Sequence, residues 1–198
     1  MSRPPLDRLL RPRSIAFVGG KAAEEAVRQS RAFGFGGAIR PVNPRRPEMA
    51  GLACLADVAA LPEPPDAVFL AAPAEPTIAL TGELAAIGAG GAICYASDFA
   101  ETGPEGRERQ VRLLKAANGM PLIGPNCYGM INAFDRVALW PDQHGCLPVE
   151  TGRGVAIVSQ SGNLALNFTM QARGLPIGYV ISVGNCADVT PADLIEAL

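Results

Sequence analysis

Short apolar runs alternate with stretches of helical periodicity along most of the chain, and this alternation constrains the fold more than any other sequence feature. Apolar runs of strand length occupy residues 14–18, 38–42, 67–72, 92–95, 121–123, 155–159 and 177–183. Apolar residues at helical spacing predict helices over residues 21–33, 77–87, 104–118, 163–173 and 191–198, the last with Thr190 as its N-cap. Strands that alternate with helices in this way predict βαβ units, a parallel sheet and therefore an α/β fold.

The alternation divides the chain into three parts. The first five expected strands fall within residues 1–129, enough for one doubly wound, Rossmann-like domain with right-handed crossovers. Residues 130–153, with Trp140, Pro141 and Pro148, show no clear period, and we expect an irregular linker there. The pattern restarts over residues 154–198 with half of a second doubly wound domain. Such a half leaves a strand edge unpaired, so either it docks on the first domain or on a partner chain, or the domain is truncated. We expect a truncated domain, cut from a longer protein.

Charge and cysteine usage exclude several classes of protein. The 17 Lys and Arg are balanced by 19 Asp and Glu, so no global basic field is present to hold a nucleic acid. No apolar run reaches the ~18 residues that a membrane span needs, and residues 15–18 are too short for a secretory signal. The five cysteines form no C-x-x-C pair. We therefore expect no metal site and a reduced, cytoplasmic protein.

The loop after the first expected strand is a candidate phosphate site. Gly19, Gly20 and Lys21 stand where that strand ends and the first helix begins. Ligands of an open α/β sheet bind beyond the carboxyl ends of its strands, and a helix N-terminus suits an anion. A tight turn without a ligand is the alternative, because the full G-x-G-x-x-G fingerprint is absent.

Two arginines follow the second expected strand. Val42 and Asn43 end this strand, and Arg45 and Arg46 come directly after it. An NAD site carries an acidic residue at this place, to bind the ribose hydroxyls. Arginines suit instead a terminal phosphate on an adenosine ribose, which points to CoA, with NADP as the alternative ligand. A solvated basic loop also explains the pair.

The loops after the next three strands carry weaker signals. Pro73 follows the third strand, and Ser97 and Asp98 follow the fourth, where small residues let a flat ligand lie against the backbone. Asn126 and Cys127 follow the fifth strand. Cys127 invites a nucleophile interpretation, yet no histidine is near it in the sequence. We expect a packed or loop-lining cysteine.

The turn after the sixth expected strand is a second candidate phosphate site. Ser161, Gly162 and Asn163 lie between that strand and a helix, which is a sound arrangement for binding an anion. A hydrolase elbow would need a glycine in place of Ser159 and an acid–base partner for the serine. The single histidine, His144, falls in the irregular region. We predict phosphate binding here and no catalytic residue.

Taken together, these loops resemble the ADP-forming acyl-CoA synthetases, a family that includes the α subunit of succinyl-CoA synthetase. The opening LDRLLRPRSIA at residues 6–16 is similar to that family's entry to its CoA-binding domain. Further motifs match in order and spacing: PVNP at 41–44, FAE at 99–101, GPNC at 124–127, SQSG at 159–162, and SVGN at 182–185 followed by Ala187 and Asp188. The resemblance covers essentially the whole chain.

The resemblance implies a CoA-binding domain followed by a flavodoxin-like ligase domain. In this family an acyl phosphate forms, CoA attacks it, and a histidine carries the phosphoryl group to ADP on an ATP-grasp domain, which also holds Mg. The implied CoA contacts are Gly19, Gly20, Lys21, Val42, Asn43, Arg46, Pro73, Ser97 and Asp98, and Arg45 is a further candidate. The GPNC loop with Asn126 and Cys127 would lie near the CoA thiol. Ser161, Gly162 and Asn163 would cradle the phosphate on the histidine.

Three departures from the family pattern limit what this chain is expected to do. The first loop is shorter than usual in the family, because the chain passes from Gly20 almost directly into a helix. Leu166 stands where succinate-using members carry a tyrosine, which argues against succinate as the acid. The phosphorylated histidine falls beyond residue 198, and the ATP-grasp domain is missing, so we expect the chain alone to be inactive.

Two other interpretations stay open on the sequence alone. One is an NADP-binding oxidoreductase or redox-sensing Rossmann domain, which the arginine pair allows. The other is a non-catalytic CoA-binding relative with a regulatory role. In the preferred interpretation the partners are CoA, a carboxylic acid and an ATP-grasp domain or subunit. A homo-oligomer is compatible with this interpretation.

Overall fold

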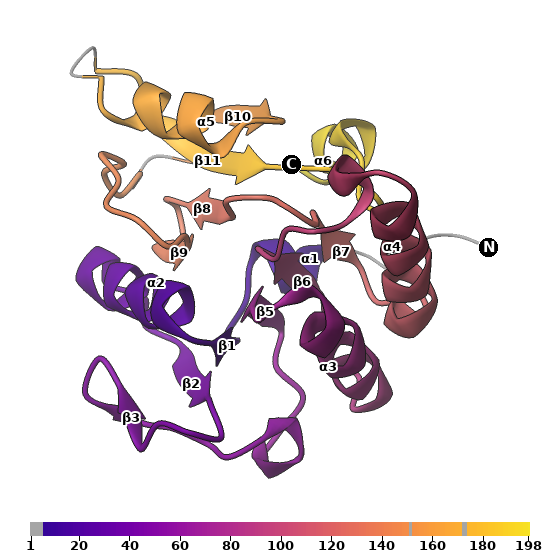
Figure 1. Ribbon diagram of the computed structural model, residues 1–198. Coiled ribbons are helices and arrows are strands. Elements are labelled where there is room, and N and C mark those ends of the chain that lie inside the picture. Colours follow the sequence, from indigo (N-terminus) through magenta and orange to yellow (C-terminus); the bar gives the residue numbers. More distant parts are fainter. Residues whose placement is uncertain (1–5, 151, 172–173) are drawn as a thin grey trace.

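The first half of the chain forms a five-stranded parallel sheet. In the computed structural model, which describes residues 6–150, 152–171 and 174–198, its strands are ordered β2-β1-β5-β6-β7 (Figure 1). They are β1 (Ser14–Gly19), β2 (Ala38–Val42), β5 (Ala67–Ala71), β6 (Ala92–Cys94) and β7 (Leu122–Ile123). β1 pairs with β2 on one side and with β5 on the other, so the strand order reverses direction between β1 and β5. The predicted α/β fold is confirmed.

Helices cover both faces of this first sheet. They are α1 (Asp7–Leu10), α2 (Lys21–Phe33), α3 (Ala74–Ala86) and α4 (Pro104–Ala117). The connections also hold a small hairpin and two turns of 3-10 helix: β3 (Glu48–Met49), β4 (Leu52–Ala53), η1 (Val58–Ala60) and η2 (Ala100–Thr102). α3 begins one turn earlier than expected, because proline is tolerated in a first helical turn. In α4 the side chain of Leu113 is buried, whereas that of Val111 is exposed.

The second half of the chain forms a four-stranded mixed sheet in the order β10-β11-β8-β9. Its strands are β8 (Met130–Asn132), β9 (Val137–Leu139), β10 (Val155–Ser159) and β11 (Ile177–Ser182). β10 is parallel to β11, whereas β8 is antiparallel to both β11 and β9. The expectation of an irregular linker over residues 130–153 is therefore wrong for its first part, whereas residues 140–150 lie in no helix or strand. Its first part is a buried hairpin, followed by the fully buried Trp140.

The second half of the chain also contains two helices, of which α5 packs against β10 and β11. α5 (Gly162–Thr169) is shorter than the predicted helix over residues 163–173, whose residues 172 and 173 lie outside the described part of the chain. α6 (Pro191–Ala197) begins at the predicted N-cap. There Thr190 and Asp193 form a capping box, in which each side chain accepts a hydrogen bond from the other residue's backbone. No helix among the described residues has the length and apolar character to cross a membrane.

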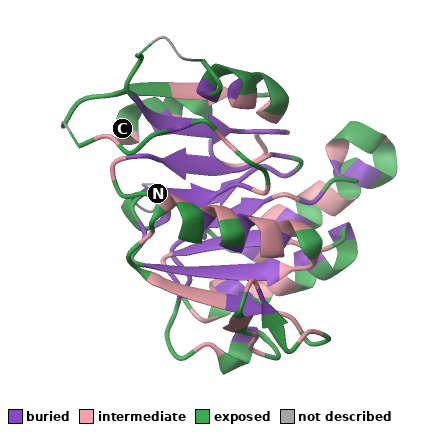
Figure 2. Ribbon diagram, turned by 90° about the vertical axis from the view of Figure 1, so that its left-hand side faces the viewer, coloured by how far each residue is buried: buried purple, intermediate pink, exposed green. Residues whose placement is uncertain are grey.

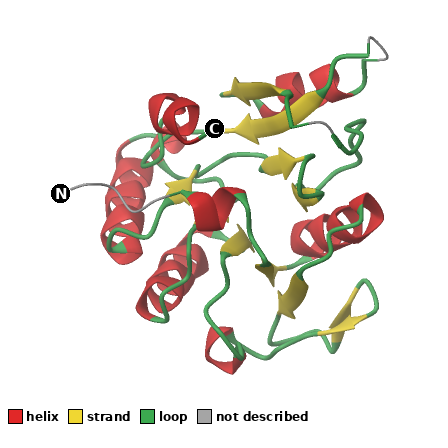
Figure 3. Cartoon of the chain, turned by 180° about the vertical axis from the view of Figure 1, so that it is seen from behind, coloured by secondary structure: helices red, strands yellow, loops and turns green. Residues whose placement is uncertain are grey.

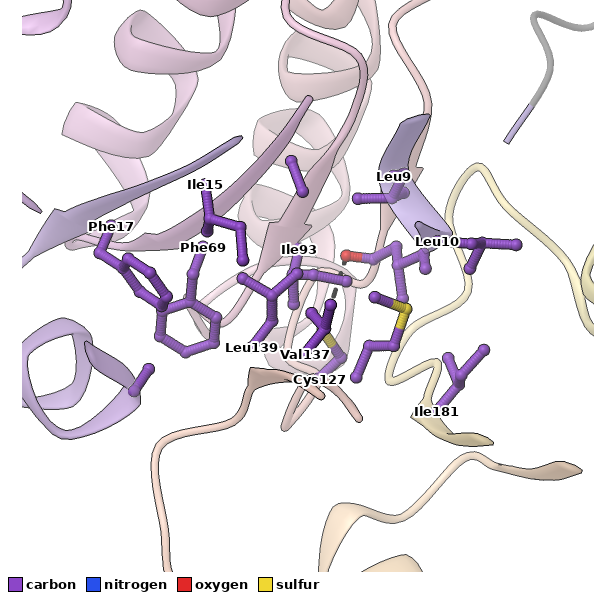
Figure 4. Packing of buried hydrophobic residues seen from close by; sticks show 14 of the residues in the cluster. Leu9, Leu10, Ile15, Phe17, Phe69, Ile93, Cys127, Val137, Leu139 and Ile181 are labelled. Carbon is purple, nitrogen blue, oxygen red and sulfur yellow. Dashed lines mark hydrogen bonds between the residues drawn. The ribbon is translucent and has the colours of Figure 1, made fainter. Parts of the chain in front are cut away.

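One hydrophobic cluster joins the two sheets. Figure 4 shows Phe17, Phe69 and Ile93 of the first sheet beside Leu139 and Ile181 of the second, and all five are fully buried. Buried strands of both sheets lie at the centre of the molecule (Figure 2), and the longer helices lie around them (Figure 3). Because the apolar surfaces of the two sheets cover each other, the loops at their ends hold fixed positions relative to one another.

Candidate ligand-binding site

The end of β1 has a backbone that only glycine fits. Gly19 has a φ of +141°, and a Cβ atom there would lie 2.2 Å from the carbonyl oxygen of Ala71, at the end of β5. This is the point where the strand order reverses, the usual ligand position in an open α/β sheet. Gly20 is the N-cap of α2 and offers no side-chain cap, and Lys21 is exposed beside it. The first N–H groups of α2 are thus available to an anion.

Asn43 ties the loop after β2 to the loop after β1. Its Nδ2 donates a 2.6 Å hydrogen bond to the carbonyl oxygen of Gly19, and its Oδ1 accepts from the backbone N–H of Arg45 at 2.8 Å. Both polar ends of the side chain are therefore engaged by the protein. Val42 is only 2% exposed and packs in the core, so its side chain is not available to a ligand.

The structure separates the two arginines that the sequence could not rank. Arg46 Nη1 lies 2.5 Å from Glu24 Oε2 in α2, and Arg28 holds the other oxygen of that carboxylate at 2.6 Å. The hydrogen bond from Arg46 is the main cause that lowers the pKa of Glu24. Arg45 is exposed, and within the described residues its guanidinium forms no ion pair. Glu24 was not predicted as a site residue, although it lies in the first turn of the predicted helix over residues 21–33.

An outer cavity of about 730 Å³ lies beyond the ends of β5 and β6. It is lined by Pro73 and Asp98, both predicted site residues, and by residues at the start of α3 and α4. Asp98 has a φ of +71°, and its carbonyl oxygen accepts a 2.7 Å hydrogen bond from Arg109 of α4. Arg109 also lies 3.6 Å from Glu75, so its charge is partly balanced.

A second cavity of about 350 Å³, here called the inter-sheet cavity, lies where loops of the two sheets meet. Its lining combines two sets of predicted residues that are far apart in the sequence: Ser97, Asn126 and Cys127 from the first set, and Ser161, Gly162 and Asn163 from the second. The wall is completed by Tyr95, Tyr128 and Gln160, none of which was predicted as a site residue. Tyr128 directly follows the GPNC motif, which was the available signal.

Cys127 is a packed side chain that borders this cavity. It is 3% exposed, and its thiol donates to the carbonyl oxygens of Cys94 at 3.3 Å and of Ile123 at 3.5 Å. Burial raises the pKa of the Cys127 thiol well above its ordinary value. A thiol in this state is a poor nucleophile, which agrees with the expectation of a packed, loop-lining cysteine.

The turn before α5 has the geometry of an anion site. Ser161 is the N-cap of α5, and its Oγ accepts from the N–H of Leu164 at 3.3 Å. Gly162 is needed because a Cβ atom there would lie 2.2 Å from Cβ of Tyr128. Asn163 is exposed at the first turn of the helix. The remaining first-turn N–H groups point beyond the helix start, as an anion requires.

No acid–base partner for Ser161 is visible in the described part of the chain. His144 packs edge-to-face on Phe33 of α2, with ring centroids 4.9 Å apart. Its Nδ1 is buried without a hydrogen-bond partner, and burial lowers the pKa of the ring. None of the hydrogen bonds among described residues joins His144 to Ser161. The geometry gives no support to a serine hydrolase.

Comparison with known proteins gives two family matches. Residues 13–133 match the family described as CoA binding domain, and residues 152–198 match the succinyl-CoA ligase like flavodoxin domain. A trans-feruloyl-CoA synthase from an unknown prokaryotic organism is 37% identical over 100% of this chain. The α subunit of an ADP-forming acetate–CoA ligase from Pyrococcus furiosus is 31% identical over 98% of it.

A solved structure shares the fold. The dinucleotide forming acetyl-coenzyme A synthetase 1 of Ca. Korarchaeum cryptofilum, in complex with phosphate and ADP, superimposes with a TM-score of 0.86 at 28% identity over 98% of this chain. All these relatives are longer. This chain spans 29% of the feruloyl-CoA synthase, 43% of the Pyrococcus subunit and 42% of the Korarchaeum chain.

Proposed function

The chain belongs to the CoA-binding domain family, and on this premise we propose that it is the CoA-binding portion of an ADP-forming acyl-CoA synthetase. In the complete reaction, an acyl-CoA, ADP and phosphate are converted reversibly into the free acid, CoA and ATP. The chemistry passes through an acyl phosphate and a phosphohistidine. This chain would supply the CoA site and one wall of the phosphate site.

The inter-sheet cavity carries this proposal. It places the loop expected near the CoA thiol, with Asn126, against the loop expected to hold phosphate, with Ser161. A thiol that attacks an acyl phosphate has to reach the acyl carbon while the phosphate is held, so both loops must border one space. The cavity meets this requirement with side chains from both sheets.

The remaining predicted residues divide between the two ends of CoA. We propose that Gly19, Gly20 and Lys21 receive the pyrophosphate at the N-terminus of α2. Arg45 is proposed to bind the ribose 3′-phosphate, because its guanidinium is exposed, whereas Arg46 is held by Glu24. The proposed path to the thiol runs past the loops after β5 and β6, where Pro73, Ser97 and Asp98 lie. Val42 and Asn43 shape the backbone under the nucleotide and do not offer free side-chain groups.

The acid substrate is proposed to be a carboxylic acid other than succinate. Leu166 of α5 packs against the apolar cluster around Trp140 and presents no hydroxyl to a second carboxylate. The two relatives named above act on different acids, acetate and trans-ferulate by their names, so the family match alone does not choose the acid.

The second half of the chain is proposed to be the start of a flavodoxin-like ligase domain. Leu164 and Phe168 of α5 are about half exposed, and β10 forms an edge of its sheet. We propose that the rest of the ligase domain covers this face and that an ATP-grasp domain or subunit supplies ATP, ADP and Mg. A cytoplasmic location belongs to the same proposal and is supported by the free thiols of Cys54, Cys94, Cys127 and Cys146.

Calorimetric titration of the 198-residue chain with CoA and with NADPH tests the proposal. We expect saturable binding of CoA and none of NADPH. Binding of NADPH without binding of CoA would show that the arginine pair serves a redox domain instead. A chain that binds CoA but shows no effect of inorganic phosphate on the amide resonances of residues 161–164 would refute the assignment of the second loop.

A further inference from the structure

The carboxylate of Glu101, in η2, accepts hydrogen bonds from groups in both halves of the chain. Its Oε1 accepts hydrogen bonds from the backbone N–H groups of Asp98 at 2.8 Å and Phe99 at 3.2 Å. Its Oε2 accepts a hydrogen bond from Nδ2 of Asn185, in the SVGN motif of the second half. The FAE and SVGN motifs, neither of which the proposed function uses, therefore meet at one hydrogen bond.

The contact with Glu101 fixes which way the Asn185 amide points. An ionised carboxylate can only accept hydrogen bonds, so the amide nitrogen of Asn185 has to face it. The oxygen Oε1 of Gln110 lies 3.2 Å from the same nitrogen and accepts from it as well. The oxygen Oδ1 of Asn185 consequently faces the other way, where it accepts from Nδ2 of Asn126 at 3.4 Å.

The orientation of Asn185 determines the orientation of Asn126 in turn. With its nitrogen engaged by Asn185, Asn126 keeps its oxygen Oδ1, which accepts no hydrogen bond from the described residues. The backbone here is held as well: the N–H of Asn126 donates to Ala96 at 2.8 Å, and the N–H of Asn185 donates to Pro125 at 2.8 Å. Asn126 is exposed and is one of the residues that line the inter-sheet cavity, so its side-chain oxygen is open to a ligand that enters there.

We propose that Glu101 is a positioning residue that acts through Asn185 to present the side-chain oxygen of Asn126 as a hydrogen-bond acceptor inside the inter-sheet cavity. The ligand group that this oxygen would bind is a donor at the reactive end of CoA, either the amide N–H or the thiol S–H of its cysteamine unit. The inference rests on the proposed function, because it assumes that this end of CoA enters the cavity.

The charge of Glu101 supports this role. Burial alone would raise its pKa, but the hydrogen bonds from Asn185, Phe99 and Asp98 outweigh burial and lower it. The group is therefore ionised at neutral pH and accepts at both oxygens. A glutamine in its place would have to turn its NH₂ either toward Asn185 or toward the two backbone N–H groups. Either choice sets donor against donor and removes the constraint on Asn126.

The test exchanges the carboxylate and the amide between positions 101 and 185. Glu101→Gln and Asn185→Asp should each break the series of hydrogen bonds, the second by setting two carboxylates against each other. In the double variant, the amide introduced at position 101 can accept from the backbone and donate to the carboxylate introduced at position 185. That carboxylate still accepts from Asn126, so the orientation of Asn126 is restored with the charge on the other side of the contact. Glu108→Gln, an identical change at an exposed position of α4, is the matched control.

Each protein, as the 198-residue chain, is titrated with CoA and with adenosine 3′,5′-bisphosphate, which lacks the pantetheine and cysteamine. The measured quantity is the ratio of the two dissociation constants. We expect both single variants to lose about threefold to tenfold of the preference for CoA, the range of one hydrogen bond. The double variant and the control should keep the preference. Desulfo-CoA, which retains the amide but not the thiol, identifies the donor.

The outcomes separate this inference from the proposed function. Wild-type protein that binds neither ligand refutes both. Two outcomes would overturn the inference and leave the proposed function standing. In the first, wild-type protein binds both ligands equally. In the second, the single variants keep the full preference for CoA while their melting temperatures fall. Both outcomes show instead that Glu101 only joins the two halves. The inference is also overturned if the double variant folds and loses the preference for CoA to the same extent as the single variants.

Discussion

Replacing Arg45 and Arg46 one at a time tests the nucleotide end of the proposed CoA site. The two residues are adjacent and have the same charge, so a nonspecific electrostatic effect on a phosphate would be nearly equal for both. The structure makes them unequal. Arg46 is paired with Glu24 at 2.5 Å, whereas Arg45 is exposed and forms no ion pair with any described residue.

The expected change in CoA affinity depends on the interactions that each arginine makes in the absence of CoA. A charge-assisted hydrogen bond to a phosphate contributes about 1.5–3 kcal/mol, and an exposed residue falls near the lower end, about a tenfold change in affinity. Arg45 would exchange only its contacts with solvent for a contact with the phosphate. Arg46 would exchange one partly exposed ion pair, worth about 0–1 kcal/mol, for another, and Arg28 would still hold Glu24. We therefore expect Arg45→Ala to weaken CoA binding about tenfold and Arg46→Ala to weaken it less.

Calorimetry with CoA and with dephospho-CoA isolates the 3′-phosphate. Arg45→Ala should reduce the affinity for CoA and leave that for dephospho-CoA within about twofold, because the ligands differ only in the group that Arg45 is proposed to contact. Glu24→Gln should free Arg46 and tighten CoA binding. Equal losses for both ligands in Arg45→Ala would refute the assignment. A selective loss only in Arg46→Ala would show that the pair with Glu24 opens when CoA binds.

Three further predictions concern Gly19, Ser161 and Glu101. Gly19→Ala should lower the free energy of unfolding by about 3 kcal/mol in urea titration, because its Cβ atom meets the carbonyl oxygen of Ala71 at a positive φ; an unchanged midpoint would contradict this. Ser161→Ala should cost about 1 kcal/mol through loss of the N-cap and leave CoA affinity unchanged, which thermal melting and calorimetry measure together. The pKa of Glu101 is lowered, so its stabilising effect is present above its ordinary value of 4.5 and is lost as the pH falls through the lower folded value. Glu101→Gln should therefore flatten the acid limb of the stability curve, and an identical limb would contradict the shift.

The first half of the fold was predictable because its main helices are long and clear turn residues separate its strands from them. The predicted helix over residues 21–33 and the strand over residues 38–42 match α2 and β2 at both ends. Helix α2 ends at Gly34, which adopts the left-handed conformation that is typical of a glycine at the end of a helix. The buried strands of the parallel sheet are near-continuous apolar runs, which are easy to find.

The hairpin of the second sheet was missed for a physical reason. β8 and β9 have three residues each, and all six are buried, so no alternation of polar and apolar residues marks them. In the turn between them Arg136 has a φ of +57°. An arginine in a sequence does not predict this left-handed conformation. The ion pair of Glu24 with Arg46 was also missed, because it joins α2 to the loop after β2 and has no local pattern.

The spacing between the GPNC and SVGN motifs is fixed by the fold before any ligand binds. The backbone N–H groups of Asn185, Ala187 and Val189 donate to the carbonyl oxygens of Pro125, Gly124 and Leu122 at 2.8–3.1 Å. A side-chain oxygen of Asp188 accepts from the N–H of Leu122 at 2.9 Å, which closes the series. Backbone pairing of this kind constrains where the two loops lie, whatever the cavity binds. The matched motifs are therefore evidence for how the two halves are joined. The evidence for a ligand lies instead in groups that this pairing leaves unused: the N-terminus of α5, the guanidinium of Arg45 and the side-chain oxygen of Asn126.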